Sequence, residues 1–162
     1  TSVLHFRVWP LDLDLSMHMN NGRYLTIMDL GRIDIMVRSG LWRVILRERW
    51  TPIAGAIQIR YSRELRLFDR FRLETRLVAW DDTLAVMEQV LVIASGPREG
   101  QVAARALFKG GIYDRAARAY VPVARMVQEI GVDAASPAQT PEVAAFLAAD
   151  DALRAAGAAS GA

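Results

Sequence analysis

The stretch Asp12-Leu-Asp-Leu-Ser-Met-His-Met-Asn-Asn-Gly-Arg-Tyr24 places a carboxylate, a hydroxyl, an imidazole and two carboxamides within ten residues. It leads into residues 24–39, where apolar side chains recur at helical spacing and predict a long helix beginning at about Arg23. Three residues suited to capping come just before it, namely Asn20, Asn21 and Gly22. A helix N-terminus offers unpaired backbone N–H groups and a partial positive charge, which stabilise an oxygen that develops negative charge. With Asp14 as base or nucleophile, the stretch indicates an enzyme that acts on a carbonyl group.

Apolar residues change to a period of two on both sides of this helix, which is typical of half-buried strands. The predicted strands are residues 3–9, 57–61, 71–77, 84–93 and 102–113. The last four are joined by segments rich in turn residues, so we expect them to form an antiparallel meander. The economical fold is an α+β domain in which a five-stranded antiparallel sheet wraps around the long helix. Gly31 lies on the apolar face of that helix, which predicts close packing against another element.

The remaining sequence predicts shorter helices and a flexible end. Residues 41–49 suit a short helix or a loop, residues 123–130 suit one or two helical turns, and Pro141 begins a last helix through about Arg154. Residues 155–162 are small or polar, so we expect disorder there. The predicted organisation is one domain over residues 1–131 and a C-terminal extension over residues 132–162.

Composition excludes several classes of function. Nineteen of the twenty basic residues are arginine, and Lys109 is the only lysine, but charges of both signs alternate, so no arm for nucleic acid is expected. The absence of cysteine removes disulfides, thiolate metal ligands and a cysteine nucleophile. His5 and His18 are not spaced as a metal pair, so we expect no metal. Without a signal peptide or a membrane span in the sequence, the expected location is cytoplasmic.

The motif Asp-x-x-x-His-x-Asn-Asn-x-x-Tyr at the helix start resembles that of a known family. It is carried here by Asp14, His18, Asn20, Asn21 and Tyr24. The order of strand, polar loop, long helix and further strands is similar to hotdog-fold acyl-CoA thioesterases of the 4-hydroxybenzoyl-CoA thioesterase type. The form of the motif is particularly similar to the THEM6-like branch, and plant acyl-carrier-protein thioesterases share a related version. Those plant enzymes carry an asparagine where Ser16 stands here, so the resemblance does not imply a strict copy of their catalytic network.

The resemblance implies hydrolysis of an acyl-CoA or acyl-carrier-protein thioester by a homodimer or tetramer, with the acyl-pantetheine arm entering at a dimer interface. It implies that Asp14 is the catalytic carboxylate, that His18 orients water or Asp14, and that Asn21 and the backbone of Gly22, Arg23 and Tyr24 lie near the oxyanion. No cofactor is expected, since coenzyme A is part of the substrate. Arg60 and Arg63 are candidate contacts for its phosphates.

Structural explanations compete with these roles. Asp14 could cap a turn, the asparagines could cap the helix, Asp12 could be exposed or accept a loop hydrogen bond, and Asp29 could either pair with Arg32 or face a partner's site. A Ser-His-Asp triad from Ser16, His18 and Asp14 is rejected, because residues this close in a loop seldom reach triad geometry.

Four apolar residues are candidates to line an acyl tunnel: Leu25, Met28, Trp42 and Trp50. Two other functions stay open. One is a non-catalytic acyl-binding or assembly protein, and the other is an acyl-CoA hydratase or dehydratase.

Overall fold

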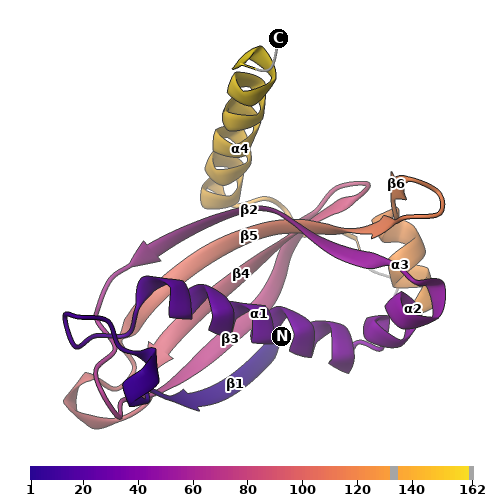
Figure 1. Ribbon diagram of the computed structural model, residues 1–162. Helices are drawn as coiled ribbons and strands as arrows, with labels where there is room; N and C mark the ends of the chain where they lie inside the picture. Colours follow the sequence, from indigo (N-terminus) through magenta and orange to yellow (C-terminus); the bar gives the residue numbers. More distant parts are fainter. Residues whose placement is uncertain (132–134, 161–162) are drawn as a thin grey trace.

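The computed structural model describes residues 1–131 and 135–160 of the chain. In this part of the chain the strands are β1 (Ser2–Arg7), β2 (Thr51–Tyr61), β3 (Arg70–Trp80), β4 (Leu84–Ile93), β5 (Val102–Asp114) and the short β6 (Ala119–Tyr120). The helices are α1 (Asn21–Arg38), α2 (Leu41–Glu48), α3 (Val123–Glu129) and α4 (Pro141–Ser160), with 3-10 turns at η1 (Pro10–Asp12) and η2 (Gly96–Arg98). Figure 1 shows the five long strands curving around α1, as predicted.

The sheet has the order β1-β3-β4-β5-β2, all neighbours being antiparallel, and β6 adds to β5. The predicted meander of four successive strands is therefore wrong for its first strand. β2 pairs with β5, for example Ile59 with Ala106, and β1 takes the place beside β3. The connection over residues 62–69 is longer than the two to five residues typical of a hairpin, so it crosses the end of the sheet. This crossing leaves β2 at an edge.

Helix α1 lies directly on the sheet because Gly31 has no side chain. A Cβ atom at this position would overlap Thr75 Oγ1 and lie 2.7 Å from Leu73 Cδ2. Asn20 is the N-cap residue, and its side chain accepts a hydrogen bond from the backbone N–H of Gly22 at 2.8 Å. The helix thus begins two residues before the predicted Arg23, and the predicted close packing of Gly31 is confirmed.

The core runs along α1 as two clusters. One surrounds the first half of the helix and includes Tyr24, Met28 and Phe71. The other surrounds its C-terminal end, where α2, α3 and the end of β5 contribute Val44, Met126 and other residues. The two ends of α1 therefore have different surroundings: a polar loop at its start and an apolar cluster at its end.

Helix α4 packs on the sheet by its first half only. Val143 and Phe146 are buried against Ala79 and Val86, and Lys109 forms an ion pair with Asp150 at 2.9 Å. Residues 151–158 are exposed, and Figure 1 shows this half of the helix projecting beyond the sheet.

The disorder predicted from residue 155 is wrong up to Ser160, and residues 161–162 lie outside the described part. The domain boundary after residue 131 stays a prediction. Within the described residues, no helix combines the length and the apolar character needed to cross a membrane.

Candidate active site

The loop between η1 and α1 folds into a small hairpin that brings Asp14 and His18 together. The Asp14 N–H donates to the His18 carbonyl at 2.9 Å, and Leu13 and Met19 form a bridge beside them. Met17 has a φ of 61°, in the left-handed region that non-glycine residues seldom adopt. Backbone strain of this kind is concentrated at functional sites.

The Asp14 side chain is half-buried and holds its own turn. Its Oδ1 accepts hydrogen bonds from the Ser16 N–H at 2.8 Å and from the His18 N–H at 3.5 Å. In the part of the chain that the structure describes, Oδ2 has no hydrogen-bond partner. One oxygen therefore fixes the carboxylate while the other is available to a water or a carbonyl carbon. The capping role and the catalytic role of Asp14 are compatible.

Asp12, in contrast, is a buried structural acceptor. Its Oδ1 accepts a hydrogen bond from Arg23 Nε at 2.7 Å, and its Oδ2 accepts one from the Trp9 N–H at 2.8 Å. The Arg23 side chain is thus tied to Asp12. Of the two interpretations of Asp12, the loop acceptor is correct and the exposed carboxylate is wrong.

Two of the predicted oxyanion donors are engaged at the start of α1. The Gly22 N–H donates to the Asn20 side chain, and the Arg23 N–H donates to the Asn20 carbonyl at 2.9 Å. The Asn21 side chain is exposed and, among the described residues, has no hydrogen-bond partner. Its carboxamide is therefore available to a ligand at this helix start.

Tyr24 belongs to the core rather than to the polar loop. Its ring packs edge to face on Tyr61 with centroids 5.1 Å apart, and the Tyr61 hydroxyl donates to the Asn21 carbonyl at 3.2 Å. Burial raises the pKa of Tyr24 to about 12. The phenol therefore stays protonated at neutral pH and anchors the first turn of α1 to β2.

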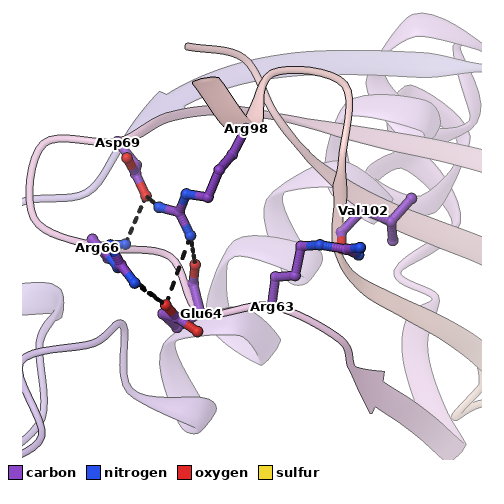
Figure 2. Close-up of polar contacts among 6 residues, drawn as sticks. All are labelled: Arg63, Glu64, Arg66, Asp69, Arg98 and Val102. Carbon is purple, nitrogen blue, oxygen red and sulfur yellow. Dashed lines mark hydrogen bonds and ion pairs between the residues drawn. The ribbon is translucent and has the colours of Figure 1, made fainter. Parts of the chain in front are cut away.

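The segment that crosses the end of the sheet supports the Asp14 loop. The Met19 N–H donates to the Leu65 carbonyl at 2.8 Å, and His18 lies opposite Arg66. Figure 2 shows the network that holds this segment, in which Arg98 donates to the Glu64 carbonyl at 3.0 Å and to Asp69 at 2.6 Å. The position of His18 thus depends on contacts between turns that are far apart in the sequence.

Glu64 lies in the segment across from the His18 loop, and its carboxylate is bound to Arg66 at 2.6 Å. A hydrogen bond from its own backbone N–H lowers the pKa of Glu64, and Arg66 and nearby His18 lower it further. Sequence reasoning missed Glu64, because no local pattern reveals which residue lies across from the His18 loop.

The two arginines predicted to contact phosphates are placed differently. Arg63 donates to the Val102 carbonyl at 3.3 Å, beside the network in Figure 2. Arg60 lies on the face of the sheet opposite α1, since the next residue, Tyr61, packs against that helix. The phosphate contacts at Arg60 and Arg63 stay a prediction.

An apolar cavity of about 470 Å³ lies at the other end of α1. Ile33, Met36, Trp42, Phe108 and Met126 are among its lining residues, so α1, α2, α3 and the sheet all contribute. Within the described residues, Asp29 and Arg32 are its only charged lining residues, and they form an ion pair. Along α1, the lining begins at Asp29 and ends at Ser39, about 12 Å and 27 Å from Asn21 at 1.5 Å per residue. The cavity therefore lies along the second half of α1, away from the Asp14 loop of the same chain.

Of the four residues predicted to line a tunnel, Trp42 alone lines this cavity. Met28 is fully buried and Leu25 packs against the same core cluster, while Trp50 belongs to the cluster at the end of α1. Sequence reasoning also missed the contribution of α3, where Val123, Met126 and Val127 face the cavity. Their spacing is that of an apolar helix face and was the available signal.

Residues 8–147 match the family model described as "Thioesterase-like superfamily". The chain belongs to this superfamily. It is 41% identical over 93 residues to Protein THEM6 of Danio rerio, covering 57% of this chain and 46% of the relative. It is 34% identical over 102 residues to Protein THEM6 of Drosophila melanogaster, covering 62% and 51%. The chain thus spans about half the length of the curated relatives it matches.

Two solved structures illustrate the fold that this chain shares with other proteins. YbaW, a probable thioesterase from Escherichia coli, is similar with a TM-score of 0.70 and 23% identity, over 79% of this chain and 94% of that one. A mutant 4-hydroxybenzoyl CoA thioesterase complexed with 4-hydroxybenzoyl CoA gives a TM-score of 0.71 at 13% identity, over 78% and 96%. The predicted hotdog fold and family are confirmed, and at these identities the structural likeness shows the fold alone.

Proposed function

We propose that this chain hydrolyses an acyl-CoA thioester to a free carboxylic acid and coenzyme A, and that Asp14 carries the reaction. The observation that carries this proposal is the Asp14 carboxylate just before α1, with Oδ1 bound in its turn and Oδ2 without a hydrogen-bond partner among the described residues. Membership of the thioesterase-like superfamily supports the reaction class.

Two routes fit this geometry. In the first, Asp14 Oδ2 takes a proton from a water whose oxygen adds to the thioester carbon, and the carbon–sulfur bond then breaks. In the second, Oδ2 adds to that carbon itself, and water hydrolyses the resulting anhydride. In both, the coenzyme A sulfur leaves with the bonding electron pair and acquires a proton. The start of α1 and the Asn21 carboxamide stabilise the oxyanion, while His18 orients the water or Asp14.

In this proposal the substrate binds at the interface of a homodimer. Strand β2 is an edge strand whose Tyr61 end lies beside the start of α1 and whose Ile53 end lines the cavity. Helix α1 also exposes Leu30, Ile33 and Val37, each at least 40% accessible. Antiparallel pairing of β2 with the β2 of a second copy would cover the open edge. It would also bring the Asp14 loop of one chain toward the apolar cavity of the other, where an acyl chain could bind.

Two other functions use parts of the same structure. A non-catalytic acyl-binding protein needs the cavity but not the free oxygen of Asp14. A hydratase would act on the double bond of an enoyl-CoA rather than on the thioester.

One set of assays separates these possibilities. Free thiol release is measured from short, long and aromatic acyl-CoAs and from acyl-carrier-protein thioesters, and double-bond absorbance is followed with an enoyl-CoA. Thiol release from at least one substrate is the expected result. Saturable binding without thiol release would support the acyl-binding protein, and loss of the double bond with an intact thioester would support the hydratase.

A further inference from the structure

Two exposed arginines lie side by side near the candidate active site. Arg7, the last residue of β1, is directly opposite Arg70, the first residue of β3. Both are exposed, and neither guanidinium is bound to a carboxylate within residues 1–131 and 135–160. Like charges directly opposite each other destabilise an antiparallel pair. An anion bound between the two guanidinium groups would remove this repulsion.

Nearby acidic groups do not supply that anion. Asp69, next to Arg70, accepts hydrogen bonds from Arg98 Nη2 at 2.6 Å and from the Arg66 N–H at 2.8 Å. Glu74, on the same strand, is bound to Arg72 at 2.6 Å. The positive charge of Arg7 and Arg70 is therefore left to solvent or to a ligand.

Two exposed aromatic rings adjoin the arginine pair. Trp9 and Phe68 are 55% and 53% accessible, and their rings meet edge to face at 6.2 Å. The Arg7 guanidinium lies 6.0 Å from the Trp9 ring centroid. Phe68 has a φ of 66°, so its exposed ring is held by a strained backbone. Exposed aromatic faces beside guanidinium groups bind a flat base and its phosphates.

This surface is built on the same segment that supports the Asp14 loop. The Phe68 N–H donates to the Val8 carbonyl, and the Val8 N–H donates to the Asp69 carbonyl, both at 3.0 Å. Arg66, four residues before Arg70, lies opposite His18, and four residues span at most about 14 Å. One short segment therefore separates the aromatic surface from the proposed site of hydrolysis.

We propose that this surface binds the adenosine phosphate end of coenzyme A. Arg7 and Arg70 would bind its phosphates, and the adenine would stack on Trp9 with the perpendicular Phe68 ring against its edge. This assignment rests on the proposed thioesterase function, because the pantetheine arm must then reach from these residues to Asp14. It differs from the contacts predicted at Arg60 and Arg63 in providing aromatic rings beside the charges.

The test compares two thioesters that carry the same acyl group. One is the acyl-CoA, and the other is the N-acetylcysteamine thioester, which lacks the phosphates and the adenine. The double variant Arg7→Gln/Arg70→Gln is expected to raise KM for the acyl-CoA about tenfold, since two charge-assisted contacts are lost. Its kcat, and its kcat/KM for the short thioester, should stay at the wild-type values.

Two controls accompany this comparison. Arg115→Gln/Arg118→Gln removes two exposed arginines at the opposite end of the sheet and should leave both substrates unaffected. Arg60→Gln/Arg63→Gln tests the alternative phosphate contacts. An equal loss with both thioesters in the Arg7 and Arg70 variant, or a selective loss in the Arg60 and Arg63 variant alone, would overturn the assignment.

A binding measurement keeps the assignment testable if no thioester is hydrolysed. Adenosine 3′,5′-bisphosphate should quench tryptophan fluorescence in the wild type, and this quenching should be lost in Trp9→Phe. Bisphosphate binding without hydrolysis of any thioester would contradict the proposed function but support this assignment. Hydrolysis without bisphosphate binding would support the proposed function and contradict this assignment. Binding to anionic phospholipid vesicles instead of bisphosphate would overturn the assignment and make the surface a membrane contact.

Discussion

Replacing Gly31 by alanine adds one methyl group at the closest contact between α1 and the sheet. The new carbon would overlap Thr75 Oγ1, and it would lie 2.7 Å from Leu73 Cδ2 and 3.1 Å from Gln89 Nε2. All three side chains are fully buried. Gln89 is also held in place, since it donates to the Met28 carbonyl at 2.8 Å and accepts from Arg32 at 2.6 Å. The neighbours cannot move aside, so the helix itself must shift.

The expected cost follows from two opposing effects. Overpacking of a well-packed core costs about 1–3 kcal/mol, and exchanging glycine for alanine within a helix returns about 1 kcal/mol. Because the clash involves three fixed side chains, we expect the upper part of the first range and a net loss of about 2 kcal/mol in the free energy of unfolding. A helix shift on the order of 1 Å also misplaces the start of α1, so thioester hydrolysis should fall by up to about a hundredfold.

Urea unfolding and a hydrolysis assay measure the two effects. Gly157→Ala is the matched control, because Gly157 is also helical but an added Cβ there meets nothing within 4 Å. That control should be neutral or slightly stabilising. A Gly31→Ala variant as stable and as active as the control would refute the idea that close contact between α1 and the sheet positions the site.

Two further predictions concern buried polar groups. Lys109→Met leaves Asp150 in a largely buried site without its cation and should lower the free energy of unfolding by about 3 kcal/mol. The double variant Lys109→Met/Asp150→Leu should regain most of this loss. Equal stabilities of the single and double variants in urea would contradict this prediction. Because burial raises the pKa of Tyr24 to about 12, the unfolded chain loses this proton first, so stability should fall as the pH rises from about 10 to 12. In urea unfolding, the stability of Tyr24→Phe should decline less over that pH range than the stability of the control Tyr120→Phe, whose replaced side chain is exposed. Identical declines would contradict the raised pKa of Tyr24.

Local patterns predicted the elements of the fold but not all of their pairings. The helical period and the cap at Asn20 located α1, and Gly31 correctly indicated a close approach. The pairing of β2 with β5 joins residues about fifty positions apart, and no local pattern encodes such a register. The expected disorder after residue 155 overlooked the fact that alanine has the highest helix propensity. That propensity continues α4 to Ser160.

The candidate site was predictable to a similar extent. The spacing of Asp14 and His18 predicted one polar loop, and the structure places them opposite each other in a hairpin. Which oxygen of Asp14 is free depends on hydrogen bonds that the sequence cannot rank. Met28 and Trp42 are both large and apolar, yet only Trp42 lines the cavity. The space left between packed helices decides this difference.

The kcat of Asp14→Asn, measured beside the wild type with the best acyl-CoA, tests the central claim most directly. The amide keeps an oxygen that can accept from the Ser16 and His18 N–H groups, so the loop and the thermal stability should be preserved. It cannot act as a base or a nucleophile, so we expect kcat to fall by at least about a hundredfold. His18→Ala should cost less if His18 only orients the reacting groups. Unchanged turnover in Asp14→Asn would remove Asp14 from the mechanism.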